Sequence, residues 1–347
     1  MAYTAVDKSS SAFKAVKYNG TGSSNAITGV GHQPDFLWIK KANGAEHHIL
    51  VDAVRGIDKQ LYSSHNSSQD TNAQSVTAVG ADGFTVGTNS QTNDSSNIFI
   101  AQLWKGANGT ASNSSGSITS TVSANTTAGI SICTWTGTGS AATIGHGLGV
   151  APKTIFIKNA STTNGGSDYH ELPGNTHRLF LNGAIAREDN ASAFNDTSPT
   201  STVFSIGTNT NVNQNGDTIV AYCFAEKRGF SKFGFYKASG NADGPFIYTG
   251  FKPAFIIVKN YEETQSWVMW NQGLNTTNQP QFFHHHPNTT DTWVDNSNNI
   301  DVLSNGFKIR TSNSTGPEIN NTQYDHVYWA FAEAPLVGSN NIPVTAR

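Results

Sequence analysis

One short pattern occurs three times in this chain, and the repetition constrains the fold more than any other feature. Each copy reads Gly-X-X-Pro followed by an apolar run that ends in lysine, at residues 31–40, 149–158 and 250–259. The copies begin 118 and 101 residues apart. A period of about 100 residues is too long for a solenoid repeat or a propeller blade, but it fits an independent β domain. The sequence therefore predicts three related β modules.

Other landmarks keep one order around each copy. A strand-like run opens each repeat at residues 16–20, 130–137 and 233–237, and an apolar run containing alanine closes it at residues 98–104, 219–224 and 327–331. Between them, a strand-like run begins with Gly-Phe at residues 83–86 and 306–309. The second repeat has the corresponding run at residues 203–206, without the glycine. We predict an N-terminal arm (1–12), a first β repeat (13–105), a polar linker (106–128), a second repeat (129–226), a third (227–335) and a C-terminal tail (336–347). Within the linker, the alternation at residues 118–122 makes that stretch a candidate short strand.

The apolar runs have the character of buried strands. Residues 36–39 and 254–258 are short, continuous and rich in β-branched and aromatic side chains, which favours strands covered on both faces. Proline beside each run suits a strand start. No segment has a convincing helical period. The fold class we predict is all-β, with tandem β-sandwich or jelly-roll-like modules.

Composition excludes some functions. Only 13% of the residues are charged, the net charge is −3 and no basic block occurs, so nucleic-acid binding is not expected. No apolar run reaches the length of a membrane span. The first residues lack the apolar core of a signal peptide, which predicts synthesis in a cytoplasm without export through the secretory route.

Two cysteines, Cys133 and Cys223, stand on the first and last predicted strands of the second repeat. Terminal strands of a sandwich often lie side by side, so a disulfide is geometrically open to them. The favoured interpretation is two buried thiols. Their spacing does not resemble a zinc motif.

Candidate chemistry is sparse. Asp52 and Arg55 are three residues apart after a strand, and we favour a structural ion pair over a catalytic carboxylate. The acids Glu262 with Glu263, and Asp291 with Asp295, are the sugar-cleaving pairs to consider, but they lie in polar loops without a local signature. No nucleophile elbow, phosphate loop or dinucleotide fingerprint occurs. We predict no catalytic residue, no cofactor and no metal.

Aromatic and histidine side chains concentrate in the third repeat, among asparagine, glutamine and threonine. The ligand or interface candidates are Trp267, Trp270, Phe282, Phe283, His284, His286 and Trp293. Aromatic faces beside amides suit both sugar recognition and protein interfaces. His284 and His286 would share one face of an extended segment, where they could bind a metal or meet symmetry mates on an oligomer axis. We favour a solvated or stacking loop over both.

Several segments together match a known pattern: the Met-Ala-Tyr-Thr start, the three Gly-X-X-Pro strands, and residues 52–56 (DAVRG), 83–86 (GFTV), 118–125 (ITSTVSAN) and 334–344 (APLVGSNNIPV). In this combination the chain resembles a family of marine bacteriophage virion proteins, common in cyanophages and described as tail-fibre-like or structural. The resemblance covers nearly the whole chain and contains no catalytic motif. The second repeat departs from it at the DAVRG and GFTV positions.

The resemblance implies a non-enzymatic virion protein, made in the host cytoplasm and released by lysis. We expect a tail appendage or fibre component that forms a homo-oligomer, for which a trimer is one candidate. It would contact phage tail or capsid proteins, and host surface glycan through the third repeat. One alternative is a capsid decoration protein (cement or head fibre), anchored by Ala2, Tyr3, Thr4 and Val6. The other is a glycan depolymerase.

Overall fold

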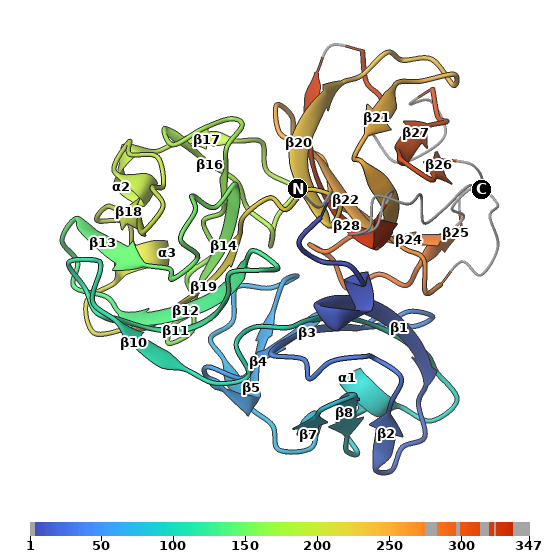
Figure 1. Ribbon diagram of the computed structural model, residues 1–347, viewed down its shortest axis with the longest axis horizontal. Helices are drawn as coiled ribbons and strands as arrows, with labels where there is room; N and C mark the ends of the chain where they lie inside the picture. The colour runs from blue at the N-terminus through green and yellow to red at the C-terminus, as the bar shows by residue number, and fades with distance from the viewer. Residues whose placement is uncertain (1–3, 275–282, 296–298, 313–318, 323, 336–347) are drawn as a thin grey trace.

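A computed structural model of the chain describes residues 4–274, 283–295, 299–312, 319–322 and 324–335 (Figure 1). The fold is all-β, as the apolar runs predict, and it contains three β-sandwich-like modules arranged around a common centre. Every pairing between named strands is antiparallel in the described residues, and each module has one six-stranded sheet with smaller sheets packed against it.

Module 1 has the large sheet β1-β9-β3-β4-β5-β6 and the small sheet β2-β8-β7. Its elements are η1 (Ser9–Ser11), β1 (Phe13–Asn19), β2 (Asn25–Ile27), β3 (Phe36–Lys41), β4 (Ile49–Asp52), β5 (Gly56–Tyr62), β6 (Asp70–Thr71), β7 (Val76–Gly80), β8 (Gly83–Val86), α1 (Ser90–Asn93) and β9 (Ile98–Trp104).

Module 2 has the large sheet β10-β11-β12-β19-β14-β15 and two two-stranded sheets, β13-β18 and β16-β17. Its elements are β10 (Ala111–Asn113), β11 (Ser120–Asn125), β12 (Ile130–Thr136), β13 (Ala142–Gly145), β14 (Thr154–Asn159), β15 (Tyr169–His170), β16 (His177–Arg178), β17 (Glu188–Asp189), α2 (Ala191–Phe194), β18 (Val203–Ile206), α3 (Thr210–Asn213) and β19 (Thr218–Phe224).

Module 3 has the large sheet β20-β28-β22-β23-β24-β25 and the small sheet β21-β27-β26. Its elements are β20 (Ser231–Lys237), β21 (Phe246–Tyr248), β22 (Phe251–Asn260), β23 (Val268–Asn271), β24 (Phe283–His285), β25 (Val294–Asp295), β26 (Ile300–Leu303), β27 (Gly306–Ile309) and β28 (Asp325–Pro335).

The three large sheets share one core topology, which confirms the internal repeat. The opening strand pairs with the closing strand, the closing strand with the Gly-X-X-Pro strand, and that strand with the next one in sequence. The corresponding orders are β1-β9-β3-β4, β12-β19-β14-β15 and β20-β28-β22-β23. The opening and closing strands are neighbours although a whole module separates them in sequence.

The central strands are buried on both faces because each large sheet lies between two cores. In β3, Phe36 and Trp38 face a core shared by all three modules, whereas Leu37 and Ile39 face the sandwich core of module 1. Strands β14 and β22 alternate in the same way between the shared core and their own sandwich cores. This double burial explains why these strands read as continuous apolar runs and not as alternating ones.

The segment 106–128, which we expected to be a polar linker with a candidate short strand at 118–122, contains two strands. Strands β10 and β11 form within this segment and extend the large sheet of module 2 through antiparallel pairing with β12. Strand β10 is the edge strand of this sheet and β11 is paired on both sides, so backbone hydrogen bonds hold both although their side chains are mostly polar. No helix among the described residues is both long and apolar enough to cross a membrane.

Candidate functional site

The modules meet at a cluster of aromatic rings on the pseudo-threefold axis. Trp104, Phe224 and Phe331 occupy equivalent positions on the closing strands β9, β19 and β28. Each pairs with the equivalent residue of the Gly-X-X-Pro strand, which is Phe36, Thr154 or Phe255. Their ring centroids are 5.5 to 6.1 Å apart in all three pairs. All three side chains are buried. The centre of the molecule is therefore packed with side chains and is not a pore.

The lysine that ends the apolar run of each Gly-X-X-Pro motif joins its module to a neighbour. Each ammonium donates a hydrogen bond to a backbone carbonyl of the adjacent module. The three bonds are Lys40 to Thr290 (3.2 Å), Lys158 to His65 (2.6 Å) and Lys259 to Ala184 (2.9 Å). They run from module 1 to 3, from 2 to 1 and from 3 to 2, which closes a ring. Burial lowers the pKa of Lys40 and Lys158 to about 8 and that of Lys259 to about 7.

A second ring of contacts joins the same three modules in the opposite direction around the centre, from 1 to 2, from 2 to 3 and from 3 to 1. The last residue of β4, β15 or β23 contacts a closing strand in the next module. The pairs are Asp52 with Tyr222 (2.8 Å between oxygens), His170 with Trp329 (5.6 Å between ring centroids) and Asn271 with Gln102 (3.0 Å between side-chain amides). The equivalent positions thus hold different residue types in one geometry. The three interfaces are divergent copies of one interface.

The interface between modules 1 and 2 contains the ion pair expected from sequence. Arg55 Nε donates to Asp52 Oδ2 at 2.7 Å, and the Tyr222 hydroxyl donates to the same oxygen. Burial lowers the pKa of Arg55, but Asp52 and Tyr222 outweigh it and hold that pKa above the usual value. Burial, followed by the Asp52 charge, raises the pKa of the Tyr222 hydroxyl far above its usual value. Arg55 stays protonated and Tyr222 stays neutral, so this network is structural.

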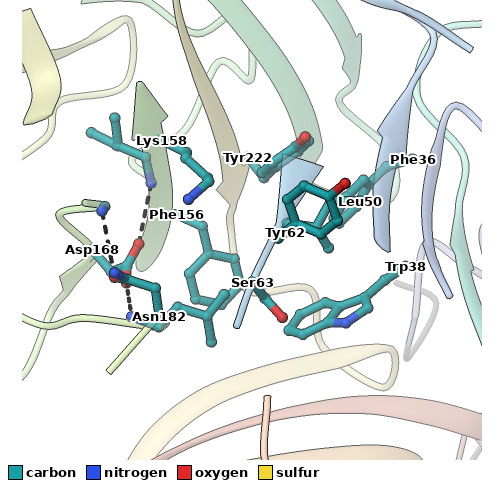
Figure 2. Close-up of a pocket in the computed structure, with 13 residues that line it drawn as sticks. Phe36, Trp38, Leu50, Tyr62, Ser63, Phe156, Lys158, Asp168, Asn182 and Tyr222 are labelled. Carbon is teal, nitrogen blue, oxygen red and sulfur yellow. Dashed lines mark hydrogen bonds between the residues drawn. The ribbon is translucent and has the colours of Figure 1, made fainter. Parts of the chain in front are cut away.

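A small cavity lies beside this network, between modules 1 and 2 (Figure 2). Phe36, Leu50 and Phe156 line its apolar side, and Lys158 and Asp168 line its polar side. The volume open to the centre of a water molecule is about 20 Å³, which is roughly what one ordered water needs. The cavity lies between modules 1 and 2 and has room for about one water molecule.

Asp168 and Lys158 have the perturbed pKa values that often mark an active site. Burial raises the pKa of Asp168 to about 7, although the backbone amides of Leu181 and Ile157 donate to its carboxylate. Figure 2 shows these hydrogen bonds as dashed lines. A buried lysine of lowered pKa recurs in all three modules, whereas a single active site would distinguish one. Lys158 therefore serves the interface with module 1, whereas Asp168 holds backbone segments of its own module.

Two of the three tryptophans expected as ligand or interface residues, Trp267 and Trp270, are buried. Trp267 stacks on Trp329 with ring centroids 4.7 Å apart, and its Nε1 donates to the Phe180 carbonyl of module 2 at 2.7 Å. Trp270 lies in the sandwich core of module 3. Their exposed fractions are 0% and 1%, so neither ring offers a face to a ligand. Trp267 belongs to the interface between modules 3 and 2.

The histidine segment also faces inward. His284 and His286 share a face, with ring centroids 5.3 Å apart, and His286 Nδ1 lies 2.8 Å from the Trp267 carbonyl. His285 points to module 1, where its ring lies 6.0 Å from that of His48. Burial lowers the pKa of both His284 and His285 to about 3. In the described part of the chain, no three His, Cys, Asp or Glu side chains gather to hold a metal ion.

Phe283 and Trp293 stack on each other with ring centroids 4.4 Å apart. Together with Leu274 they pack against Ala42 and Ile100 of module 1. They are only partly buried, and the interface they serve lies within the molecule. Phe282 lies outside the described residues.

The N-terminal arm lies against the body of the protein. Val6 is part of the shared core, and its backbone amide donates to Thr4 Oγ1 at 3.0 Å. Both side chains are buried. Ala2 and Tyr3, the other two anchoring candidates, lie outside the described residues, as does the tail at 336–347.

The acids considered for sugar cleavage hold loops in place. Glu262 accepts a hydrogen bond from the Asp325 backbone amide at 2.8 Å, and Glu263 accepts one from a tyrosine hydroxyl. Asp291 is exposed, and the Asp295 side chain lies outside the described part of the structure.

Both cysteines of module 2 are free thiols, completely buried in its sandwich core. Their Sγ atoms are 4.0 Å apart. This agrees with the favoured interpretation from sequence.

Sequence reasoning missed the residues that join the modules. The lysine that ends each apolar run is visible as part of the repeat, and its recurrence in all three copies is the signal that could have identified it. Tyr222 and Gln102 gave no such signal, because their partners come from another module.

Among known proteins, this chain matches one protein family. No curated protein and no solved structure matches the chain. One family model matches residues 8–335, a range that includes all three modules. The chain therefore belongs to the family described as a domain of unknown function (DUF7483).

Proposed function

We propose that this chain is a non-enzymatic structural protein of a bacteriophage virion, exposed on the particle as a tail appendage or fibre component that contributes to host attachment. The observation that carries the proposal is the shared aromatic core of three modules, formed by Trp104, Phe224 and Phe331 and their neighbours. One chain thereby forms a compact body with threefold pseudo-symmetry, which suits a rigid platform that presents outer surfaces and loops. The sequence resemblance to virion proteins supports the same role.

Further assembly would use the outer surfaces. The large apolar faces that could drive trimerisation of separate modules are already covered within one chain. We therefore propose that additional copies of the chain, in a trimer or another homo-oligomer, meet through their small sheets, edges and loops. Phage tail or capsid proteins would be the other partners.

Capsid decoration is the second candidate, and the pseudo-threefold arrangement is the observation that favours it. A body with approximate threefold symmetry can occupy a threefold site of a symmetric shell with one chain per site. The buried positions of Thr4 and Val6 count against the anchoring arm expected in that role, because these side chains already pack within the molecule.

The copy number of the protein in purified particles separates the two candidates. Quantitative mass spectrometry against the major capsid protein should give a few to a few dozen copies, and antibody labelling in the electron microscope should mark the tail. One copy per several capsid subunits, or more, would assign the protein to the capsid. Absence from the particle would contradict both candidates.

The non-enzymatic part of the proposal has its own test. The purified chain should release no reducing sugar from host surface polysaccharides during prolonged incubation. Release of reducing ends would support the depolymerase alternative instead.

A further inference from the structure

Large exposed apolar side chains concentrate on one face of module 3. Phe246, Tyr248 and Leu303 have exposed fractions of 44%, 55% and 38%. All three belong to its small sheet β21-β27-β26, at the outer edge of the molecule in Figure 1. Apolar groups gathered on one face are more informative than scattered ones, because gathered groups often mark binding surfaces.

The register of the small sheet places these side chains on its solvent face. Tyr248, Gly306 and Leu303 are directly opposite one another across the three strands and form one row. Phe246 stands two residues before Tyr248, so both rings leave the same face, about 7 Å apart along the strand. The intervening Ile247 points inward to the sandwich core. The ring edge of Phe246 leans over Gly306, which has no side chain to obstruct it.

The equivalent faces of the other modules lack these rings. Pairing with the Gly-Phe strand makes Ala26 and Thr143 the counterparts of Phe246. By the same register, Gly145 stands in place of Tyr248 in module 2 and Gly80 in place of Leu303 in module 1. The fold therefore forms without aromatic groups at these positions, and packing does not explain them in module 3.

A neutral cluster of charges borders the rings. Lys308, which faces Phe246 across the strands, pairs with Asp243 at 2.9 Å. Arg310 pairs with Asp243 at 3.0 Å and with Asp301 at 2.5 Å. Two acids and two bases give no net charge. The cluster still presents strong hydrogen-bond donors and acceptors, and Asp243 is 74% exposed.

We propose that this face, formed by Phe246, Tyr248 and Leu303 and bordered by Asp243, Asp301, Lys308 and Arg310, is a binding platform for a neutral saccharide. A pyranose ring has an apolar C–H face, which stacks on aromatic rings, and hydroxyl groups at its edge, which bond to charged donors and acceptors. The neutral border selects an uncharged sugar over an acidic one. The inference deepens the proposed attachment role and rests on it for its biological partner, host surface glycan.

Affinity electrophoresis of the purified full chain tests the platform. The gels contain dextran, mannan or galactan as neutral probes and alginate as the acidic probe. At least one neutral polysaccharide should retard the chain. The double variant Phe246→Ala with Tyr248→Ala should weaken that binding by about tenfold or more, as expected when anchor residues are truncated. Phe235→Ala is the matched control, because Phe235 is 54% exposed on β20, away from the small sheet, and should leave the binding unchanged.

Three results would overturn the platform: no retardation by any neutral probe, equal retardation of the double variant, or retardation by alginate alone. Sedimentation velocity adds a fourth, since self-association that the double variant abolishes would assign this face to a second copy of the chain. The electrophoresis needs no phage particle, so its outcome is separate from that of the copy-number measurement. Saccharide binding by a protein found on the capsid would contradict the proposed function and leave the platform standing.

Discussion

The Tyr222 hydroxyl of module 2 donates a hydrogen bond to the Asp52 carboxylate of module 1 at 2.8 Å, although 170 residues separate them. Both side chains are buried, and Arg55 completes the network. Equivalent positions make the two other interfaces through different chemistry, with His170 on Trp329 and Asn271 on Gln102. Three equivalent positions therefore join the three modules of one chain, each through a different pair of side chains.

Removal of the Asp52 carboxylate should destabilise the protein strongly. Asp52→Ala leaves the Arg55 guanidinium buried without its counter-ion, and breaking a buried pair in this way costs about 3–5 kcal/mol. Tyr222→Phe removes one hydrogen bond and keeps the ion pair, so it should cost only about 1 kcal/mol. Denaturant unfolding measures both free energies. Equal losses in the two variants would show that the ion pair does not hold this interface.

The glycine of the Gly-Phe strand should not tolerate a side chain. A Cβ added at Gly83, where φ is +153°, would lie 1.9 Å from the Ile27 carbonyl oxygen. Gly83→Ala should therefore cost about 3 kcal/mol or more, because backbone and not a movable side chain stands in the way. Gly80→Ala on the adjoining strand is the control, with no atom within 4 Å of its added Cβ. A mild effect at Gly83, close to that at Gly80, would contradict the tight approach of these strands.

Acid should weaken the interface between modules 2 and 3 through His170. Burial lowers its pKa to about 4 in the folded protein, whereas the unfolded chain binds this proton near pH 6.5. Its contribution is complete above pH 6.5. It is lost as the pH falls towards 4, at about 1.4 kcal/mol per pH unit.

His170→Asn tests this dependence, because Asn271 already occupies the equivalent position in module 3. The free energy of unfolding of the variant, measured from pH 4.5 to 8, should fall less steeply in acid than that of the parent. Above pH 7 the two curves should run parallel. Parallel curves across the whole range would mean that His170 takes up its proton equally in both states.

The two thiols of module 2 should be unreactive in the folded protein. Cys133 and Cys223 are completely buried, and burial raises the pKa of the Cys223 thiol well above its usual value. Because the thiolate is the reacting form, a disulfide reagent such as DTNB should label neither in native buffer. After unfolding it should label both. Rapid native labelling would contradict the burial, and an unfolded chain with no reactive thiol would show that the cysteines pair.

Local patterns in the sequence predicted the modules well. The continuous apolar run at Phe36–Ile39 indicates a strand covered on both faces, and the structure confirms it. Strand β10 was missed, and the alternation at residues 118–122 indicated only part of β11, because strand pairing depends on backbone hydrogen bonds and the composition of this segment is that of a linker. Composition equally fails to separate a buried aromatic side chain from an exposed one. Trp267 and Trp270 were predicted as ligand or interface residues but lie in cores. Phe246 and Tyr248 were not among the predicted residues, and they face solvent.

Calorimetry of the intact chain tests most directly the claim that three modules form one body. Because Trp104, Phe224 and Phe331 share one core, loss of any module exposes the apolar faces of the other two. We predict a single unfolding transition in which the calorimetric and van't Hoff enthalpies agree. Trp104→Ala should lower the whole transition without splitting it, for a loss of about 3–5 kcal/mol. Two or three separate transitions in the parent protein would show that the modules fold independently, and would contradict this account.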